Sequence, residues 1–296
     1  MDHKSELTGL IPAHPFFLGI DSDGCVFDSM DVKHREFFIP NVIKFFGLFS
    51  VAGIVRETWE FVNLRSVTRG INRFPALVKV FDLLRERKEY ALSGIDIPRL
   101  DDLRNWISRE SKLSNSSLNE HHLKTGDDET SLVLNWSRAV NDDIDMWLRD
   151  LPPFRNARTA IEAAAGSADI VVVSQTPQAA LEREWEEHGL RQYVSAIAGQ
   201  EFGTKSEHIA YSSKGKYDIN RIMIIGDAPG DLKAATDNGT LFYPVVPGNE
   251  EDSWKRLLEE ALPLFLEGKF TSEYQELLIS QFRKNLPAIA PWQQPS

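Results

Sequence analysis

Residues 16–30 read FFLGIDSDGCVFDSM, in which an apolar run passes directly into two aspartates, Asp21 and Asp23, separated by one residue. The run FFLGI is typical of a buried strand. Carboxylates at the end of such a strand need water or a binding partner. A tight turn with Asp as a turn former is the plain alternative. A calcium loop also begins D-x-D, but its twelfth residue here is Val32 and a strand, not a helix, precedes it.

Further apolar runs bounded by turn residues predict the rest of a sheet. They cover residues 169–174, 221–226 and 241–246, with a weaker run at 194–199. Helical patterns lie between them, as in NARTAIEAAAG before residue 169 and TPQAALEREWEEHGL after residue 174. Strands that alternate with helices favour βαβ units, so we expect an α/β fold with a mainly parallel sheet.

The segment between the first strand and residue 151 contains helical patterns and no convincing strand. It predicts an all-helical insertion, within which the polar stretch 111–129 is expected to be a loop. After the core resumes, residues 252–267 and 271–285 have helical patterns, and the Pro-rich tail beyond them is expected to fray. The predicted organisation is therefore core residues 1–30, a helical domain at 31–151, core residues 152–250 and a C-terminal helical extension at 251–296.

Composition narrows the class of protein. The chain has 296 residues, a formal net charge of −11, and 42% hydrophobic residues. The negative charge argues against binding to nucleic acid or to an anionic membrane surface. No run approaches the roughly 18 apolar residues of a membrane span, and the N-terminus does not resemble a secretory signal. The single cysteine, Cys25, fits a reducing compartment, so we expect a cytoplasmic protein.

A second pair of acids follows the strand predicted at 221–226. Asp227 ends that strand in RIMIIGDAPGDLKAA, and Asp231 lies four residues further on. A helix N-terminal acid would explain Asp231 alone. In a parallel sheet, however, both strand ends face the same crevice. Carboxylates at about 4 Å repel by roughly 4 kcal/mol at an effective dielectric of 20, so they raise one another's pKa values or need a cation. Oxygen ligands of this kind favour Mg²⁺.

With both acidic motifs in view, the sequence resembles the haloacid dehalogenase-like (HAD) superfamily, in its β-phosphoglucomutase and phosphatase-like branch. DSDGCVFDS at 21–29 matches the first motif and GDAPGD at 226–231 the fourth. Ser174 in VVVSQTP matches the second motif and Lys205 in GQEFGTKSEHI the third. The resemblance implies a Rossmann-like three-layer parallel-sheet core with an all-helical, C1-type cap domain inserted after the first strand.

The resemblance also implies a role for each matched residue. Asp21 would be the nucleophile that forms an aspartyl phosphate. Asp23 would be the general acid and base, and its main-chain carbonyl would bind the metal. Asp227 would complete the Mg²⁺ ligands. Asp231 would contact those ligands from outside or would bind the metal through a water molecule. Ser174 would donate a hydrogen bond to a phosphate oxygen.

Lys205 would neutralise phosphate charge and pair with Asp21. Lys214 and Lys216 compete with it for the third motif, since most lysines are solvated surface residues. Backbone N–H groups of Ser22 to Gly24 and near Gln175 would bind the transferring group.

Two details at the first motif bear on the chemistry. Dehalogenases of the superfamily lack the second aspartate, so Asp23 favours phosphoryl transfer to or from oxygen. Cys25 stands where the family commonly has threonine. Because a thiol is a weak donor, any hydroxyl hydrogen bond that orders this loop is lost.

The helical insertion is expected to choose the substrate. Arg65, Arg69 and Arg73 lie with Asn72 around a glycine in NLRSVTRGINRF, residues 63–74. Arginines suit a carboxylate or phosphate through paired hydrogen bonds. Pairing with nearby acids on a solvated surface is the alternative. The pair His121-His122 near acids suggests a second metal site only weakly, because adjacent histidines in a polar segment are more often surface residues.

Together these features predict Mg²⁺-dependent hydrolysis of a small phosphorylated metabolite. A sugar phosphomutase shares the first step and is the alternative. A catalytically silent binding or regulatory protein with the same fold is a more distant one. The sequence does not specify the substrate or the oligomeric state.

Overall fold

The computed structural model describes residues 3–294 and divides them into two compact units. One unit, called the core here, comprises the described residues up to Met30 together with Asp150–Asn285. The other, called the cap, comprises Asp31–Arg149 together with the described residues from Leu286 onward. The chain therefore passes between the two units three times.

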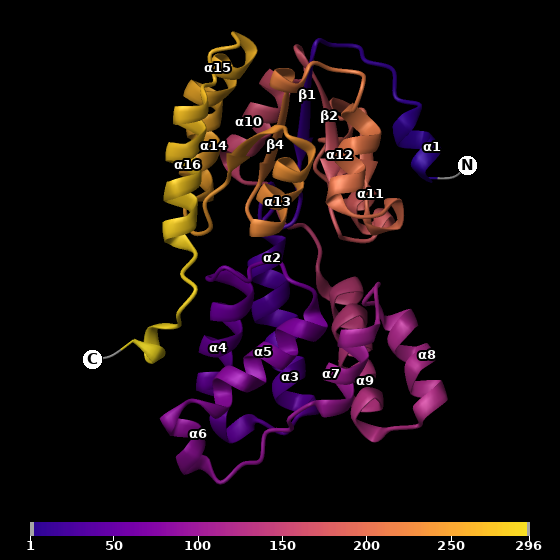
Figure 1. Ribbon diagram of the computed structural model, residues 1–296, viewed down its shortest axis with the longest axis vertical. Coiled ribbons are helices and arrows are strands. Elements are labelled where there is room, and N and C mark those ends of the chain that lie inside the picture. Colours follow the sequence, from indigo (N-terminus) through magenta and orange to yellow (C-terminus); the bar gives the residue numbers. More distant parts are fainter. Residues whose placement is uncertain (1–2, 295–296) are drawn as a thin grey trace. The chain divides into compact units, whose positions relative to one another are not determined.

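A sheet of five parallel strands forms the centre of the core, in the order β3-β2-β1-β4-β5 (Figure 1). The strands are β1 (Phe16–Ile20), β2 (Ala168–Val173), β3 (Ala196–Ala198), β4 (Ile222–Gly226) and β5 (Leu241–Pro244). All five coincide with the apolar runs, so the predicted α/β fold with a parallel sheet is confirmed. The register pairs Ile20 with both Val172 and Ile225, which means that β1, β2 and β4 end at one edge of the sheet.

Helices cover both faces of this sheet. They are α1 (His3–Thr8), α10 (Arg155–Ala164), α11 (Gln178–Glu187), α12 (Lys205–Ser213), α13 (Pro229–Asn238), α14 (Glu250–Arg256), α15 (Leu262–Leu266) and α16 (Ser272–Asn285). Successive strand residues point to opposite faces. Leu18 accordingly packs with Ile161 of α10 and Trp254 of α14, whereas Phe17 packs with Ile209 of α12 and the small residues of α13. The core thus has the three layers that the sequence predicted.

The described residues of the cap form helices and loops and contain no strand. A short α2 (Ser29–Val32) and a π-helical turn (Lys33–Phe38) lead into it, and its helices are α3 (Ile39–Phe45), α4 (Ala52–Leu64), α5 (Arg73–Arg85), α6 (Lys88–Ser93), α7 (Asp101–Arg109), α8 (Asn115–Thr125) and α9 (Asp128–Trp147). An aromatic and aliphatic cluster of its own, with Trp59 and Trp136 fully buried, stabilises it. None of the described helices of the chain is both long and apolar enough to cross a membrane.

The loop predicted at 111–129 is wrong, because α8 occupies most of it. Ser114 and Ser117 form a capping box that satisfies the first backbone N–H groups of the helix. Gly126 ends it in the left-handed conformation, with φ 69°. Leu118 is buried against the rest of the cap. Capping and one buried anchor therefore outweigh the polar composition on which the loop prediction rested.

The expectation of a frayed C-terminal tail is also wrong for residues up to 294. After α16 the chain joins the cap, where Ala290 is fully buried. The Trp292 ring meets Phe61 edge-on at 5.5 Å between centroids, and the Arg87 guanidinium lies 4.5 Å from its centroid. Proline-rich composition discourages a helix, but it does not prevent packing by the apolar residues between the prolines.

Candidate active site

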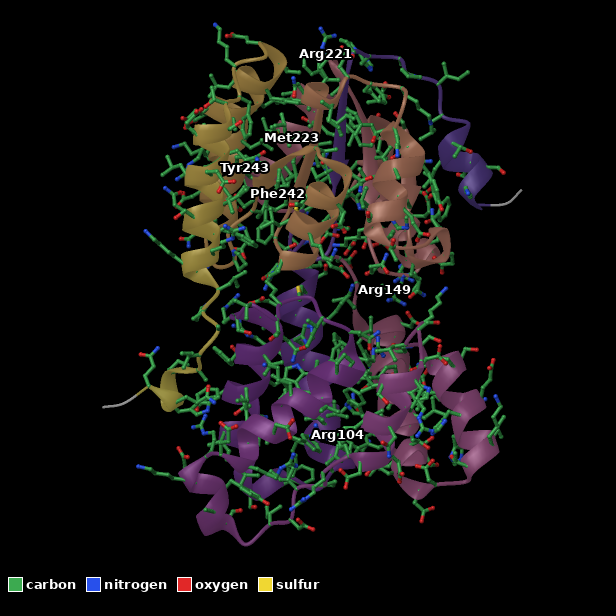
Figure 2. The ribbon with its side chains drawn as sticks, in the orientation of Figure 1. Arg104, Arg149, Arg221, Met223, Phe242 and Tyr243 are labelled. Atoms are coloured by element: carbon green, nitrogen blue, oxygen red, sulfur yellow. The ribbon has the colours of Figure 1, made fainter. Side chains whose placement is uncertain are left out.

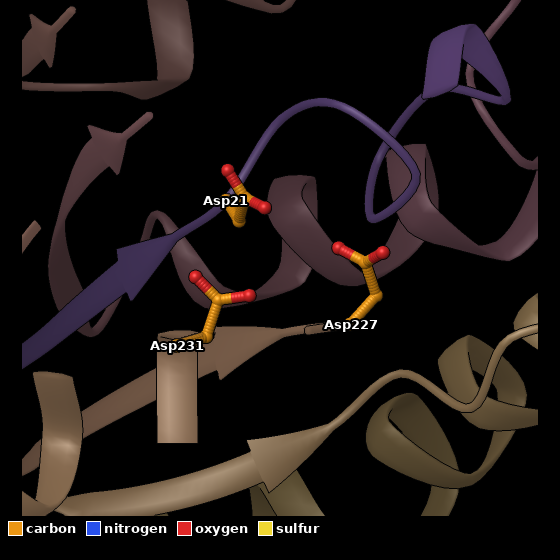
Figure 3. Close-up of side chains that lie close together, drawn as sticks. All are labelled: Asp21, Asp227 and Asp231. Carbon is orange, nitrogen blue, oxygen red and sulfur yellow. The ribbon is translucent and has the colours of Figure 1, made fainter. Parts of the chain in front are cut away.

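Three buried carboxylates meet at the edge where β1 and β4 end. Asp21 follows β1, Asp227 follows β4, and Asp231 lies in the first turn of α13. Their side chains are turned toward one another in Figure 3, and each offers an oxygen within 4.8 Å of the others. Asp21 is 5% exposed, Asp227 is 0% and Asp231 is 1%. The structure thus brings together acids that are more than 200 positions apart in the sequence.

The loop after β1, residues 21–27, is held by its own backbone. The carbonyl of Ser22 accepts the N–H groups of Cys25, Val26 and Phe27 at 3.3, 2.9 and 3.2 Å. Gly24 has φ 77°, a conformation that favours glycine, and its N–H donates to the Phe27 carbonyl at 2.8 Å. This compact turn is the structural reason for the glycine after the two aspartates.

A second glycine allows Asp231 to approach the strand. A Cβ added at Gly226 would lie 2.4 Å from the Asp231 side chain, which is too close for any other residue type. One Asp231 carboxylate oxygen accepts the Ala228 N–H at 3.0 Å, and Pro229 begins the helix at a position where its missing N–H is not needed. The GDAPGD motif therefore folds one carboxylate back toward the end of β4.

Lys205 supplies the positive charge of the cluster. Its Nζ lies 2.9 Å from Oδ2 of Asp21 and 2.5 Å from Oδ1 of Asp231. It is the first residue of α12, which Thr204 and Glu207 begin with a capping box. The competing Lys214 is exposed, and Lys216 donates to the carbonyl of Leu7. The geometry therefore singles out Lys205.

The electrostatics of the cluster favour a bound cation. Burial raises the pKa of the Asp21 carboxyl well above its ordinary value, against the opposing charge of Lys205, and Asp231 and Asp227 raise it further. Burial lowers the pKa of Lys205, but Asp21 and Asp231 more than compensate and raise it overall. One ammonium does not balance three carboxylates. The donors are all hard oxygens, which fit Mg²⁺ and would restore the ionised form of Asp21.

Asp23 is held by two hydroxyl groups. Ser29 Oγ donates to Oδ1 of Asp23, and Thr176 Oγ1 donates to Oδ2 at 2.5 Å. Asp23 itself is half-buried. The sequence analysis did not single out Ser29 or Thr176. The only available signal was a hydroxyl residue near each of two matched motifs, which is too common to stand alone.

Ser174 and Gln175 lie directly after β2, as predicted. The Ser174 hydroxyl accepts a hydrogen bond from the Thr176 N–H at 3.2 Å, and Ser174 is 2% exposed. The Gln175 amide donates to the Gly203 carbonyl at 2.9 Å. Ser174 thus lies at the same sheet edge as Asp21 and Asp227, while the side chain of Gln175 ties this loop to the segment before Lys205.

Within the cap, Arg65 and Arg69 converge on one acid. The Arg65 guanidinium lies 2.5 Å from Asp31, and that of Arg69 lies 3.7 Å from it. Arg69 also donates to the Leu64 carbonyl at 3.0 Å and is only 2% exposed. Arg35 contacts the same carboxylate at 3.4 Å. Arg35 also pairs with Glu60 at 3.0 Å, so the three arginines share two nearby carboxylates.

Asn72 and Arg73 have contacts of a different kind. The Asn72 side chain accepts the Phe74 N–H at 3.0 Å and so caps α5. Arg73 donates to the Ser137 carbonyl and hydroxyl and to Asn141, and burial lowers its pKa to about 10. Asn72 is exposed and serves as a helix cap, whereas the contacts of Arg73 tie α5 to α9 within the cap.

The second metal site suggested by His121-His122 finds no support. One ring nitrogen of His122 contacts the Asp127 carbonyl at 3.1 Å. Across residues 3–294, the one group of three or more His, Cys, Asp or Glu side chains with metal-ligand geometry is the Asp21, Asp227 and Asp231 cluster.

Comparison with known proteins finds solved structures of low sequence identity. No family profile and no curated protein matches the chain. A crystal structure described as a HAD-superfamily hydrolase of subfamily IA from Geobacter sulfurreducens is 13% identical, with a TM-score of 0.41, over 78% of this chain and 88% of that one. A candidate phosphoglycolate phosphatase from Lactobacillus delbrueckii is 14% identical, with a TM-score of 0.46, over 77% of this chain and 85% of that one.

A candidate β-phosphoglucomutase from Bacteroides vulgatus is 14% identical to the chain, with a TM-score of 0.42, over 87% of this chain and 98% of that one. All three structures are less than 15% identical to the chain.

Proposed function

We propose that the protein is a Mg²⁺-dependent phosphohydrolase that acts on a small phosphorylated metabolite through an aspartyl-phosphate intermediate. The observation that carries this proposal is the buried cluster of Asp21, Asp227 and Asp231 around the ammonium of Lys205. Three carboxylates that are buried together repel one another, and a bound cation would offset this repulsion.

The cluster is suited to hold the metal. Asp21, Asp227 and the main-chain carbonyl of Asp23 would be ligands, and Asp231 would act directly or through water. When bound, Mg²⁺ would supply positive charge that offsets the phosphate oxygens and the acids. Asp231 already accepts from Lys205 and from the Ala228 N–H, which orient its carboxylate.

In the first step, an oxygen of Asp21 attacks phosphorus while the bond from phosphorus to the substrate oxygen breaks. Asp23, protonated at this stage, gives its proton to the departing alkoxide. In the second step, the Asp23 carboxylate takes a proton from water as that water attacks phosphorus. The bond to Asp21 breaks, phosphate is released, and Asp21 and Asp23 return to their starting states.

Other residues would assist both steps. Lys205 would place positive charge beside the attacking oxygen of Asp21, and Ser174 would donate a hydrogen bond to a phosphate oxygen. Ser29 and Thr176 would aim the carboxyl of Asp23. In the cap, Arg65 would offer paired donors to a carboxylate or phosphate on the substrate, while the buried Arg69 would help to hold Asp31 beside it.

Purified protein incubated with Mg²⁺ and a panel of phosphorylated metabolites tests the proposal, with Asp21→Asn as the blank. We expect phosphate release by the wild-type protein and none above background by Asp21→Asn. Beryllium fluoride should form a Mg²⁺-dependent complex with the wild-type protein only. Release of phosphate at equal rates by Asp21→Asn would contradict the proposal, and so would failure to form the complex. Phosphoryl return to the sugar, dependent on an added bisphosphate, would indicate the mutase instead.

The cap arginines need a matched control. Arg65 and Arg104 are both 35% exposed, and each contacts one cap aspartate, at 2.5 Å and 2.6 Å (Figure 2 labels Arg104). We expect Arg65→Ala to raise KM for the best substrate about tenfold, as for a lost charge-assisted contact. Arg104→Ala should leave KM unchanged. Equal effects of the two substitutions would remove Arg65 from substrate recognition.

A further inference from the structure

Two fully buried tryptophans of the core hydrogen-bond to the loop of residues 21–27. The indole N–H of Trp254 donates to the Cys25 carbonyl at 2.7 Å, and that of Trp185 donates to the Ser22 hydroxyl at 3.0 Å. Both side chains are 0% exposed. Ser22 and Cys25 lie on either side of Asp23. The two hydrogen bonds therefore fix this loop next to the candidate reacting carboxylates of Asp21 and Asp23.

Burial alone does not explain these contacts. Trp136 and Trp106 of the cap are also buried, and their indole N–H groups have no hydrogen-bond partner among the described residues. In the core, by contrast, both indole donors are directed at one seven-residue loop from two different helices. A hydrogen bond in such a dry environment is strong, and its loss leaves the carbonyl or hydroxyl of the loop without a donor.

Trp254 is held in place by the helix that carries it. In α14 the Glu251 carboxylate accepts the N–H groups of Arg155 and Asn156, at the start of α10. The Tyr243 hydroxyl of β5 donates to the Ser253 carbonyl at 2.6 Å, and Tyr243 is among the residues labelled in Figure 2. The helix that carries Trp254 is therefore fixed by hydrogen bonds to a strand, β5, and to a second helix, α10.

Trp185 has a similar support on α11. Its ring meets Phe27, the last residue of the loop, edge-on at 6.0 Å between centroids. The Ser22 hydroxyl that accepts from Trp185 lies 3.4 Å from the Glu184 carboxylate, to which it donates. The Trp185 indole thus donates to the Ser22 hydroxyl, and the Ser22 hydroxyl donates to Glu184. These two hydrogen bonds set the side-chain rotamer of Ser22, the residue between Asp21 and Asp23.

We propose that Trp185 and Trp254 are positioning residues that hold the loop of residues 21–27 in the geometry required for attack by Asp21. This inference rests on the proposed phosphoryl transfer for its consequence in catalysis, but not for its consequence in structure. It also gives α14, part of the C-terminal extension, a role at the active site.

The experiment compares three buried tryptophan-to-phenylalanine variants, Trp185→Phe, Trp254→Phe and the control Trp136→Phe. Hydrogen exchange at the amides of Cys25, Val26 and Phe27 is the first readout and does not depend on activity. We expect exchange there to accelerate about tenfold in Trp185→Phe and Trp254→Phe, as for the loss of one hydrogen bond. Trp136→Phe should leave it unchanged. Equal exchange in all three variants would overturn the inference.

Steady-state kinetics is the second readout. With the loop displaced, we expect kcat to fall about tenfold or more with KM within twofold, because misplacement of reacting groups slows the chemical step more than binding. Trp136→Phe should keep the wild-type kcat. If the wild-type protein is active and Trp254→Phe has the same kcat, the proposed role of Trp254 in positioning the loop for catalysis is refuted. If the wild-type protein itself neither releases phosphate nor forms the beryllium fluoride complex, the proposed function fails, and hydrogen exchange still decides the inference.

Site-specific replacement of Trp254 by 3-benzothienylalanine separates the hydrogen bond from packing. This residue keeps the bicyclic shape and carries sulfur in place of the N–H group. We expect it to reproduce the faster exchange and the lower kcat of Trp254→Phe, with a smaller change in Tm. Wild-type exchange and kcat in this variant would show that packing, not the hydrogen bond, positions the loop.

Discussion

Asp21 and Lys205 show how burial changes the electrostatics of ordinary charged residues. In water their interaction would be weak, but at the end of β1 Asp21 is 5% exposed and the Lys205 ammonium lies 2.9 Å from its carboxylate. The same burial makes the pair dependent on its partners, because an ion left alone in a dry site is strongly destabilising.

Lys205→Met should therefore destabilise the protein in the absence of metal. We expect the free energy of unfolding to fall by about 3 kcal/mol, the lower end for a broken buried pair, because Asp21 can take up a proton. Lys233→Met is the control, since Lys233 is 74% exposed in its pair with Asp237 and should cost less than about 1 kcal/mol. Urea unfolding with EDTA measures both. Equal midpoints would contradict the buried pair.

Mg²⁺ should stabilise the wild-type protein, as any ligand of the folded state does. At a hundred times its Kd the increase is about 2.7 kcal/mol. Asp227→Asn removes one of the proposed ligands and should reduce this increase at the same Mg²⁺ concentration. A thermal-shift titration measures it, with K⁺ at matched ionic strength as the control. An unchanged Mg²⁺ response in Asp227→Asn would exclude Asp227 as a ligand.

The burial of His208, one turn after Lys205 on α12, predicts that the stability of the protein depends on pH. It is fully buried, and neither ring nitrogen has hydrogen-bond geometry, although the nearby Gly203 backbone favours its charged form slightly. Burial, then the charge of Lys205, lower its pKa from 6.5 to about 4. Between these values the unfolded chain binds a proton that the folded protein does not, so stability is lost as pH falls from 6.5 toward 4.

The shift in the His208 pKa sets the size of this loss of stability at low pH. The loss is about 3 kcal/mol at most. His208→Phe should remove it, so the variant should gain stability relative to the wild-type protein as pH falls from 7 to 4.5. Unfolding by urea at several pH values tests this. A constant difference between the two proteins across that range would show that His208 does not titrate as expected.

At the scale of the element, the ends of helices explain most departures from the sequence prediction. Helix α8 exists because Ser114 and Gly126 cap it, and α5 begins at Asn72 for the same reason. The sequence analysis assigned Asn72 to substrate binding because it stands among arginines. Side-chain amides serve both purposes equally well, and only the position of the Phe74 N–H distinguishes them.

Asn72→Ala should therefore lower stability by about 1 kcal/mol, the usual cost of a lost N-cap, with little change in KM. Asn72→Ser keeps a capping oxygen and should restore most of the stability. Chemical denaturation and steady-state kinetics of the two variants measure these effects. A large rise in KM in Asn72→Ser at wild-type stability would return Asn72 to the substrate site.

At the scale of the whole molecule, the chain joins its two units three times rather than twice. The third passage follows Asn285 and brings Ala290 and Trp292 into the hydrophobic cluster of the cap. Apolar residues near the C-terminus thus help to stabilise a domain whose other residues end more than 130 positions earlier in the chain.

Trp292→Ala should destabilise the cap by about 3 kcal/mol, as for an aromatic residue that loses its packing. Trp147→Ala is a matched control, since Trp147 is 68% exposed and should have little effect. Hydrogen exchange of α4 and α5 measures the change within the cap, and we expect faster exchange in Trp292→Ala alone. Protection equal to that of Trp147→Ala would mean that the C-terminal residues contribute nothing to cap stability.

The sequence alone determined the five strands, the sheet class and the acids at two strand ends, because apolar runs and motif spacing are local properties. It also pointed to Lys205, although Lys214 and Lys216 remained possible. Tertiary structure decided which lysine lies beside Asp21, that Thr176 and Ser29 hold Asp23, and that Trp254 reaches Cys25 across 229 positions. Such contacts depend on where separate elements meet in space, and no local pattern of residue types encodes that distance.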